Sequence, residues 1–393
     1  MNDDERRSQL LGSHQLLRRT LQCSLLAFAA ASIAYAFGRV ELAQNGLYTG
    51  AVILIIFWAA TLNAFRGLHA SAKLSTIGLL FGTLIPAAAI IILMFMWLGN
   101  GSPPAVPLKW SDIIPPITGV SSLVLIIGTF IAFAGLEVNA VHIRDMRNPG
   151  RDYPKGVALA VIIIFTMYVL GTISIAVAVP TSQLSLAAGA SQTFVFYMRN
   201  MRLGFGGVIL SFLLAFGALA AASTWVVGPS RGLYLVGRKG YLPSRMQTVN
   251  KNNVQVPILL VQATIVSLLT VAFVLIPDVS KAFWFLQTIT VELYMLMYVL
   301  MFISGWRLRH VRPDVPRSFH VPAMPLVAAV GTMAAVGAII IGFNPPTQLA
   351  AHVSPVLYFL LVLTGVLVLA IPPQIIYSLR RASWKNSPDT TKP

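Results

Sequence analysis

Long apolar runs recur along the whole chain and are separated by short polar or charged segments. Ten of these runs approach the roughly 20 apolar residues that a helix needs to cross a bilayer. The predicted spans are 21–37, 47–65, 74–98, 117–142, 157–180, 204–228, 256–277, 282–305, 322–343 and 352–377. Runs such as 161–165 are apolar at consecutive positions and lack the two-residue alternation of a membrane β-barrel. The pattern therefore predicts an all-α, polytopic membrane helical bundle.

The same pattern divides the chain into three parts. We expect a basic N-terminal tail over 1–20, a transmembrane domain over 21–377 and a polar C-terminal tail over 378–393. The first run has no cleavage site of the A-x-A type, so it is predicted to be a retained span. The long connections 181–203 and 229–255 are each expected to hold a short surface helix.

Composition and charge agree with a membrane protein. The chain is 56% hydrophobic with a mean hydropathy of +0.77, and 10% of its residues are charged, against about 25% in a typical soluble domain. The net charge of +16 would suggest nucleic acid in a soluble protein. With a cytosolic N-terminus, however, 23 of the 28 Lys and Arg residues fall on the cytosolic side and 5 outside. This bias predicts that both termini are cytosolic and that nucleic acid is not a partner.

The chain lacks the sequence motifs of several kinds of catalytic and binding sites. The chain contains neither a nucleotide-binding G-x-x-x-x-G-K-[ST] motif nor the H-E-x-x-H pattern of metalloproteases. Its one cysteine, Cys23, excludes an intrachain disulfide and any multi-cysteine metal site. We therefore expect neither an enzyme nor a metal or cofactor site. His142, at a span end, could sense pH or be an interfacial polar residue.

Two carboxylates, Glu137 and Glu292, lie within the predicted spans. A carboxylate costs roughly 2.5–3.5 kcal/mol at the bilayer centre, so each is a candidate for substrate or proton handling. Structural hydrogen bonding or polar packing is the alternative for both. Asp145 lies just past the end of the fourth span, in a loop where Arg and Asp alternate.

The fourth span contains a candidate break. Gly135 sits between apolar residues and is followed by Glu137 and Asn139. A break near Ala134–Leu136 would present half-helix ends, which suit ions and charged substrates. An intact helix with a small-residue packing face is the alternative.

Three aromatic side chains are candidates for a substrate path. Tyr294 and Tyr298 are four residues apart, so they share one face of a helix, where they could line a path or simply pack. Trp225 could belong to an interfacial belt or to the wall of a cavity.

Several motifs resemble a known transporter family. The stretch 133–137 (FAGLE), followed by 148–154 (NPGRDYP), resembles the sixth-helix signature of amino acid–polyamine–organocation transporters. The stretches 225–234 (WVVGPSRGLY), 240–243 (GYLP) and 249–252 (VNKN) look like the bacterial glutamate:γ-aminobutyrate antiporter branch. The resemblance extends from about residue 20 to about residue 375.

The resemblance implies a twelve-helix fold of two inverted five-helix repeats followed by two more helices. The ten spans then align with helices three to twelve, 117–305 forms the intact second repeat, and the first two family helices have no counterpart. It further implies a broken sixth helix at Ala134, Gly135 and Leu136. Asp145 and Arg151 would belong to a cytosolic gate.

The resemblance also suggests a transport path. Trp225 would line the substrate cavity, and Tyr294 and Tyr298 would lie near the path. Glu137 and Glu292, the carboxylates within the spans, complete the candidate set. Ala221 stands where the branch has a glutamate, and the branch's long C-terminal plug has no counterpart here.

The implied function is a secondary amino acid antiporter of the bacterial inner membrane, working by alternating access on amino acid or amine substrates. One alternative is a non-transporting remnant, a wrongly assigned start site or an interaction subunit. Another is a permease for cationic or neutral amino acids. The oligomeric state stays open, with a homodimer as one alternative.

Overall fold

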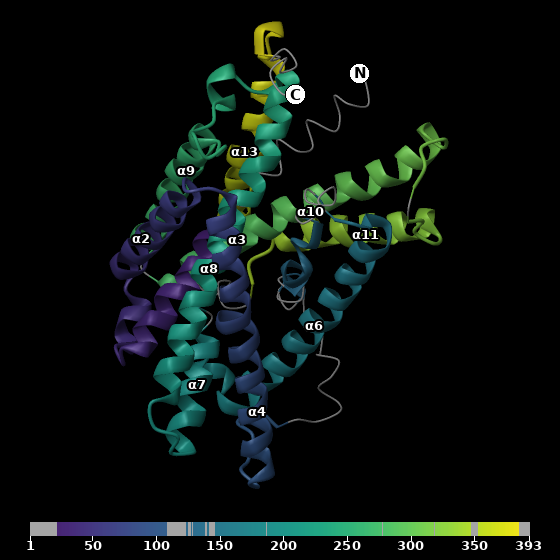
Figure 1. Ribbon diagram of the computed structural model, residues 1–393. Coiled ribbons are helices and arrows are strands. Elements are labelled where there is room, and N and C mark those ends of the chain that lie inside the picture. The colour runs from purple at the N-terminus through teal and green to yellow at the C-terminus, as the bar shows by residue number, and fades with distance from the viewer. Residues whose placement is uncertain are drawn as a thin grey trace.

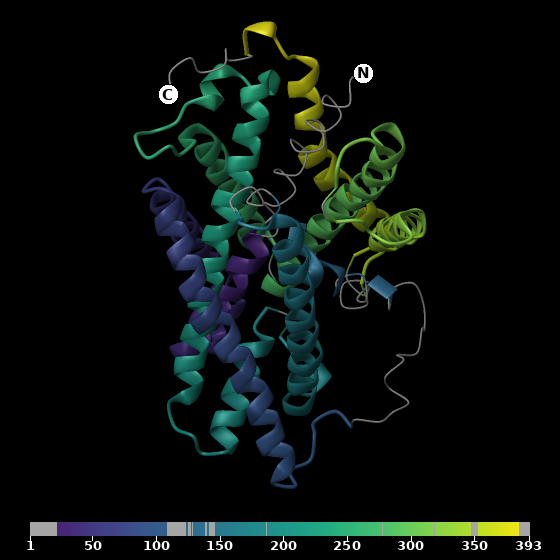
Figure 2. The ribbon, with the colours of Figure 1, turned by 45° about the vertical axis from the view of Figure 1, so that its right-hand side comes forward.

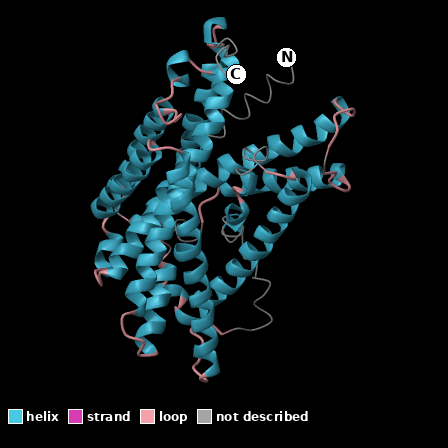
Figure 3. Ribbon diagram, in the orientation of Figure 1, coloured by secondary structure: helices cyan, strands magenta, loops and turns pink. Residues whose placement is uncertain are grey.

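The described part of the chain is helical. The computed structural model describes residues 22–107, 123–124, 127, 129–137, 140, 146–185, 187–276, 278–317, 319–346 and 353–384. These residues form helices and loops, without a β-strand among them (Figure 3). Eight of the described helices are long and apolar enough to cross a membrane. The polytopic α-helical class is thereby confirmed.

The N-terminal part contains three long helical stretches. Its elements are the first helix Gln22–Ala36, η1 Val40–Gln44, α2 Gly46–Ala64, α3 Leu68–Leu79, η2 Leu80–Leu84 and α4 Ile85–Gly99. Helices α3 and α4 form one continuous rod through the π-turn η2. Pro86 has no N–H to donate to the carbonyl of Gly82, so the helix widens at this turn.

The remaining elements follow from residue 129 onward. They are η4 Thr129–Phe133, α6 Pro149–Ala178, η6 Thr181–Gln183, α7 Gly189–Asn200, α8 Gly206–Val236, η7 Gly237–Tyr241, η8 Ser244–Gln247, α9 Val256–Leu275, α10 Val279–Val311, α11 Met324–Gly342, α13 Pro355–Ser378 and η9 Ala382–Trp384. Helix α7 is the helix expected in the connection 181–203, and η8 is a short helical turn in the connection 229–255. Most of the predicted span 117–142 lies outside the described residues.

Two helices continue beyond the ends that hydropathy predicts. Helix α8 passes through Pro229 and ends at Val236, whereas the apolar run ends at residue 228. Helix α10 continues through Arg307 and Arg309 to Val311. Hydropathy measures how favourably residues transfer into lipid. A helix can continue beyond the bilayer, because its backbone hydrogen bonds do not depend on lipid. The predicted ends were therefore wrong by about two turns in both helices.

Helices α3, α4, α7 and α8 run together along the longest dimension of the molecule (Figures 1 and 2). Helices α10 and α11 lie side by side and cross this direction at a steep angle. The α3–η2–α4 rod crosses α8 where Gly82 meets Gly217, and a Cβ on either glycine would collide with the backbone of the other. This crossing holds α8 close to the rod.

Candidate functional site

The fourth predicted span is broken at Gly135. The 3-10 helix η4 ends at Phe133, and Ala134 and Gly135 form a turn. Gly135 has a φ of 99°, which lies in the region that favours glycine because a Cβ is strained there. The break predicted near Ala134–Leu136 is therefore confirmed, and the intact-helix alternative is wrong.

The carboxylate of Glu137 folds back onto this break. The backbone N–H of Gly135 donates to Oε2 of Glu137 at 2.9 Å, and the hydroxyl of Tyr298 on α10 donates to the same oxygen at 3.2 Å. A carboxylate that accepts two donors is far less costly at membrane depth than an unpaired one. Glu137 thus connects the broken segment to α10.

The broken segment is also connected to α6. The hydroxyl of Tyr153 donates to the carbonyl of Leu136 at 3.4 Å. Sequence reasoning assigned no role to Tyr153. Its position in the motif at 148–154, directly after the broken span, was the available signal, but the motif alone does not say which backbone group the hydroxyl reaches.

Aromatic side chains of α8 and α10 surround the break. The rings of Tyr294 and Tyr298 have centroids 6.0 Å apart, and the Tyr298 ring continues to Phe302 at 6.4 Å. Ala134 and Trp225 pack against the same apolar cluster, which is built largely from α10. The structure thus brings together most of the candidate path residues, from Ala134 through Glu137 with Trp225, Tyr294 and Tyr298.

Glu292 lies in a different environment. Residues 292 and 294 are two positions apart on α10, so they point to nearly opposite sides of the helix. Glu292 is 2% exposed and its Oε1 lies against Gly342 of α11, where a Cβ would collide with it. Neither carboxylate oxygen has a hydrogen-bond partner among the described residues. The structure therefore separates Glu292 from the cluster around Gly135.

The region next to Glu292 is tied to α13. The hydroxyl of Tyr358 donates to Oγ1 of Thr288, one turn before Glu292, at 3.0 Å. Both side chains are buried. The side of α10 that carries Glu292 is thus packed between α11 and α13.

The residues of the predicted cytosolic gate are described only in part. Arg151 is exposed near the start of α6 and makes no ion pair within the described residues. Asp145 and His142 lie outside these residues. That Asp145 and Arg151 belong to a cytosolic gate stays a prediction.

A cavity of about 390 Å³ lies among the first helix, η2, α4, α6, α7 and α8. Its wall is mainly apolar, with Thr83 and Thr172 among the hydroxyl-bearing side chains, and Ala221 forms part of it. Ala221 is one turn before Trp225 on α8. The described residues hold no group of three His, Cys, Asp or Glu that could bind a metal ion.

Comparison with known proteins identifies similar transporters. The family model described as amino acid permease matches residues 20–367. An uncharacterized transporter of Legionella pneumophila is 32% identical over 83% of this chain and 71% of its own length. A glutamate/γ-aminobutyrate antiporter of Lactococcus lactis is 30% identical over 91% of this chain and 72% of its own length. A probable agmatine/putrescine antiporter of the same species is 24% identical over 48% of this chain and 40% of its own length.

Proposed function

This chain belongs to the amino acid permease family, and we propose that it is a secondary transporter that exchanges one amino acid for a related amino acid or amine. It is a multi-pass amino acid transporter of the bacterial inner membrane. Exchange is supported by the relatives named glutamate/γ-aminobutyrate antiporters, which align with 91% of this chain.

The observation that carries the proposal is the carboxylate bound at the break. The N–H of Gly135 and the hydroxyl of Tyr298 both donate to Glu137, so this position already accommodates a carboxylate. Every amino acid substrate carries the same group. The substrate carboxylate would replace that of Glu137 at these two donors, while Trp225 and Tyr294 pack against the rest of the substrate.

Alternating access would use the same contacts. Hydrogen bonds connect the break to α6 through Tyr153 and to α10 through Tyr298. Each bond is weak enough to be exchanged for a substrate contact, at about 1 kcal/mol net. Release of one bond and retention of the other would let the broken segment tilt toward α6 or α10 and open one side of the membrane at a time.

Exchange in proteoliposomes tests this proposal. Purified protein is reconstituted into vesicles that contain unlabelled glutamate, γ-aminobutyrate or a mixture of neutral amino acids, and uptake of labelled glutamate is followed. Uptake should be rapid in loaded vesicles and close to background in empty ones. Equal uptake in loaded and empty vesicles would overturn exchange, and background uptake under all conditions would overturn transport of these substrates.

A second candidate is a permease for neutral amino acids. It is favoured by the apolar cavity that Ala221 lines, to which this residue contributes only a methyl group. An apolar wall without a charged side chain suits an aliphatic substrate better than an acidic one. Competition by unlabelled leucine, lysine and γ-aminobutyrate against labelled glutamate distinguishes these substrates, because the preferred one inhibits at the lowest concentration.

We further propose that both termini and the Asp145–Arg151 gate lie on the cytosolic side, as the loop charge predicts. Cys23 is the one cysteine of the chain and is 0% exposed, so the unmodified protein should not react with a membrane-impermeant maleimide. Arg151→Cys introduces one exposed thiol at the start of α6. It should be labelled in inside-out vesicles and protected in intact cells, and the reverse result would overturn this orientation.

A further inference from the structure

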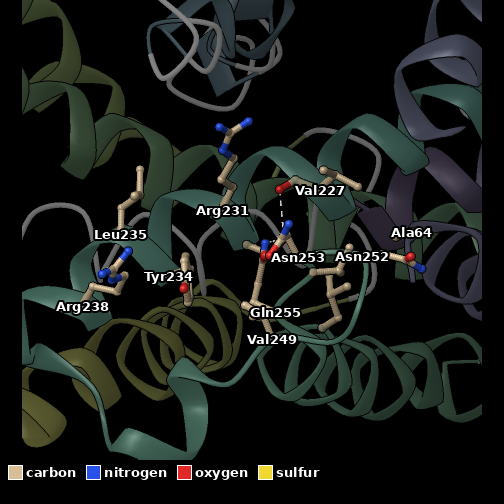
Figure 4. Close-up of a pocket in the computed structure, with 13 residues that line it drawn as sticks. Ala64, Val227, Arg231, Tyr234, Leu235, Arg238, Val249, Asn252, Asn253 and Gln255 are labelled. Carbon is tan, nitrogen blue, oxygen red and sulfur yellow. Dashed lines mark hydrogen bonds between the residues drawn. The ribbon is translucent and has the colours of Figure 1, made fainter. Parts of the chain in front are cut away.

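A second cavity, of about 440 Å³, lies at the end of α8 and differs in chemistry from the one that Ala221 lines. Its wall is formed by the last turns of α8, the end of α2, the start of α9 and the connection between α8 and α9. The lining residues are Ala64, Val227, Ser230, Arg231, Tyr234, Leu235, Arg238, Val249, Asn252, Asn253, Val254, Gln255 and Leu259 (Figure 4). None of these residues is acidic.

The positive charge of the wall comes from one side of α8 and of η7, which continues it. Arg231 on α8 and Arg238 on η7 are seven residues apart, which is close to two helical turns, and Tyr234 lies between them in the sequence. Figure 4 shows Arg238 and Leu235 at one end of the labelled lining residues and Arg231 near their middle, with Tyr234 between the two arginines. Within the described residues the guanidinium of Arg231 makes neither an ion pair nor a hydrogen bond. The cavity thus has an arginine available for an anion.

Hydrogen bonds hold the other parts of the cavity wall in place. Gln255 donates to the hydroxyl of Ser230 at 2.8 Å, and Ser230 donates to the carbonyl of Val227 at 2.9 Å. The side chains of Asn250 and Asn252 both donate to the carbonyl of Phe65 at the end of α2, at 3.0 and 2.9 Å. These bonds fix the α8–α9 connection against α8 and α2, so the cavity is built before any ligand arrives.

Exposed apolar side chains adjoin the arginines. Leu235 is 51% exposed and Val249 is 41% exposed, and both belong to the cavity lining. Ala64, Val227 and Leu259 add apolar surface to the same wall. A soluble anion would gain nothing from these side chains, whereas a phospholipid would cover them with its glycerol and acyl chains.

From this combination we propose that the cavity binds the phosphate group of an anionic phospholipid of the adjacent leaflet, with Arg231 and Arg238 as its cationic ligands. The loop charge predicts that this end of α8 faces the cytosol, where anionic headgroups attract basic residues next to a membrane span. Arginine suits phosphate because its planar N–H groups can pair with two phosphate oxygens. The site lies apart from the broken helix, so the proposal does not depend on the transported substrate.

Native mass spectrometry of the full-length protein in mixed micelles tests the proposal. We compare the retention of phosphatidylglycerol and phosphatidylcholine by the wild type, by Arg231→Gln/Arg238→Gln, and by a control, Arg199→Gln/Arg202→Gln. The control removes the same charge from exposed arginines in and just after α7. Each basic side chain near an anionic lipid contributes about a fivefold effect on affinity, so the cavity variant should bind phosphatidylglycerol about 25-fold more weakly than wild type.

The expected result is preferential retention of phosphatidylglycerol by the wild type and the control, and its loss in the cavity variant. Equal retention by both double variants would overturn the site. A second arm adds inorganic phosphate to protein in phosphatidylcholine nanodiscs. Thermal protection by phosphate that disappears only in the cavity variant would assign the site to a soluble anion and overturn the lipid. Arg231→Gln alone, with an expected fivefold loss, keeps the test decisive if the double variant does not fold.

Discussion

Glu137 and Glu292, the two carboxylates of the predicted spans, occupy opposite kinds of environment. Glu137 follows a broken helix and accepts hydrogen bonds from the N–H of Gly135 and the hydroxyl of Tyr298. Glu292 lies inside the continuous helix α10 against Gly342, and neither of its oxygens has a partner among the described residues. The difference shows how a membrane protein can supply a donor to a carboxylate. An intact helix uses its N–H groups internally, whereas a break makes one available.

The largest effect should come from filling the space that accommodates Glu292. Gly342→Ala places a Cβ against Oε1 of Glu292, and because this side chain is 2% exposed, its carboxylate has to shift within a packed environment. We expect a loss of about 3 kcal/mol in stability, at the upper end of the range for overpacking. Thermal unfolding in detergent measures it. Gly337→Ala on the same helix meets nothing within 4 Å and is the control. Equal melting temperatures for the two variants would contradict the contact.

The next effect concerns the break itself. Gly135→Ala puts a side chain at a φ of 99°, at a cost of about 2 kcal/mol in backbone strain. Because the strain falls on the segment proposed to bind substrate, the exchange rate in proteoliposomes should fall at least tenfold. Gly156→Ala in α6 meets no atom within 4 Å and should keep wild-type exchange. Wild-type exchange by Gly135→Ala would show that the break is not needed for transport.

Replacing each carboxylate with methionine should change stability in opposite directions. Glu137→Met leaves the N–H of Gly135 and the hydroxyl of Tyr298 without their acceptor, which costs about 2 kcal/mol. Glu292→Met removes a buried polar group without a partner in the described structure and should stabilise by about 1 kcal/mol. Thermal unfolding of both variants measures the signs. Destabilisation by Glu292→Met would show that Glu292 has a stabilising partner.

The same Glu292→Met variant separates packing from transport. If Glu292 belongs to the transport path, as its position within a predicted span suggests, exchange should be lost although the protein is more stable. Retained exchange in the stabilised variant would assign Glu292 to packing alone.

The smallest effects should come from removing two tyrosine hydroxyls, one near Glu137 and one near Glu292. Tyr298→Phe removes a donor to Glu137, and Tyr358→Phe removes the bond to Thr288 near Glu292. Each should cost about 1 kcal/mol in stability. The apparent affinity for substrate should fall about fivefold in Tyr298→Phe and stay unchanged in Tyr358→Phe. Parallel KM and melting measurements test this, and a substrate effect in Tyr358→Phe would contradict the separation of the two regions.

Hydropathy predicted which segments are helical and misplaced some of their ends. The spans seen as α2, α9 and α11 agree with the predicted ranges to within a few residues because their apolar runs end near turn residues or prolines. Helices α8 and α10 continue past their apolar runs because a helix with arginines is stable where water reaches it. Backbone hydrogen bonding decides where a helix ends, and transfer to lipid decides only which residues the bilayer covers.

The sequence by itself determined the class of protein, through the transfer free energy of its apolar runs. It also indicated the position of the break, through Gly135 before a polar pair together with the family resemblance, and left an intact helix as the alternative. Only the tertiary structure decided which carboxylate acquires partners. Tyr298 and Glu137 are 161 positions apart, and Glu292 and Gly342 lie on different helices. Whether a polar group at membrane depth is satisfied depends on what neighbouring helices place beside it, and helix packing sets those neighbours.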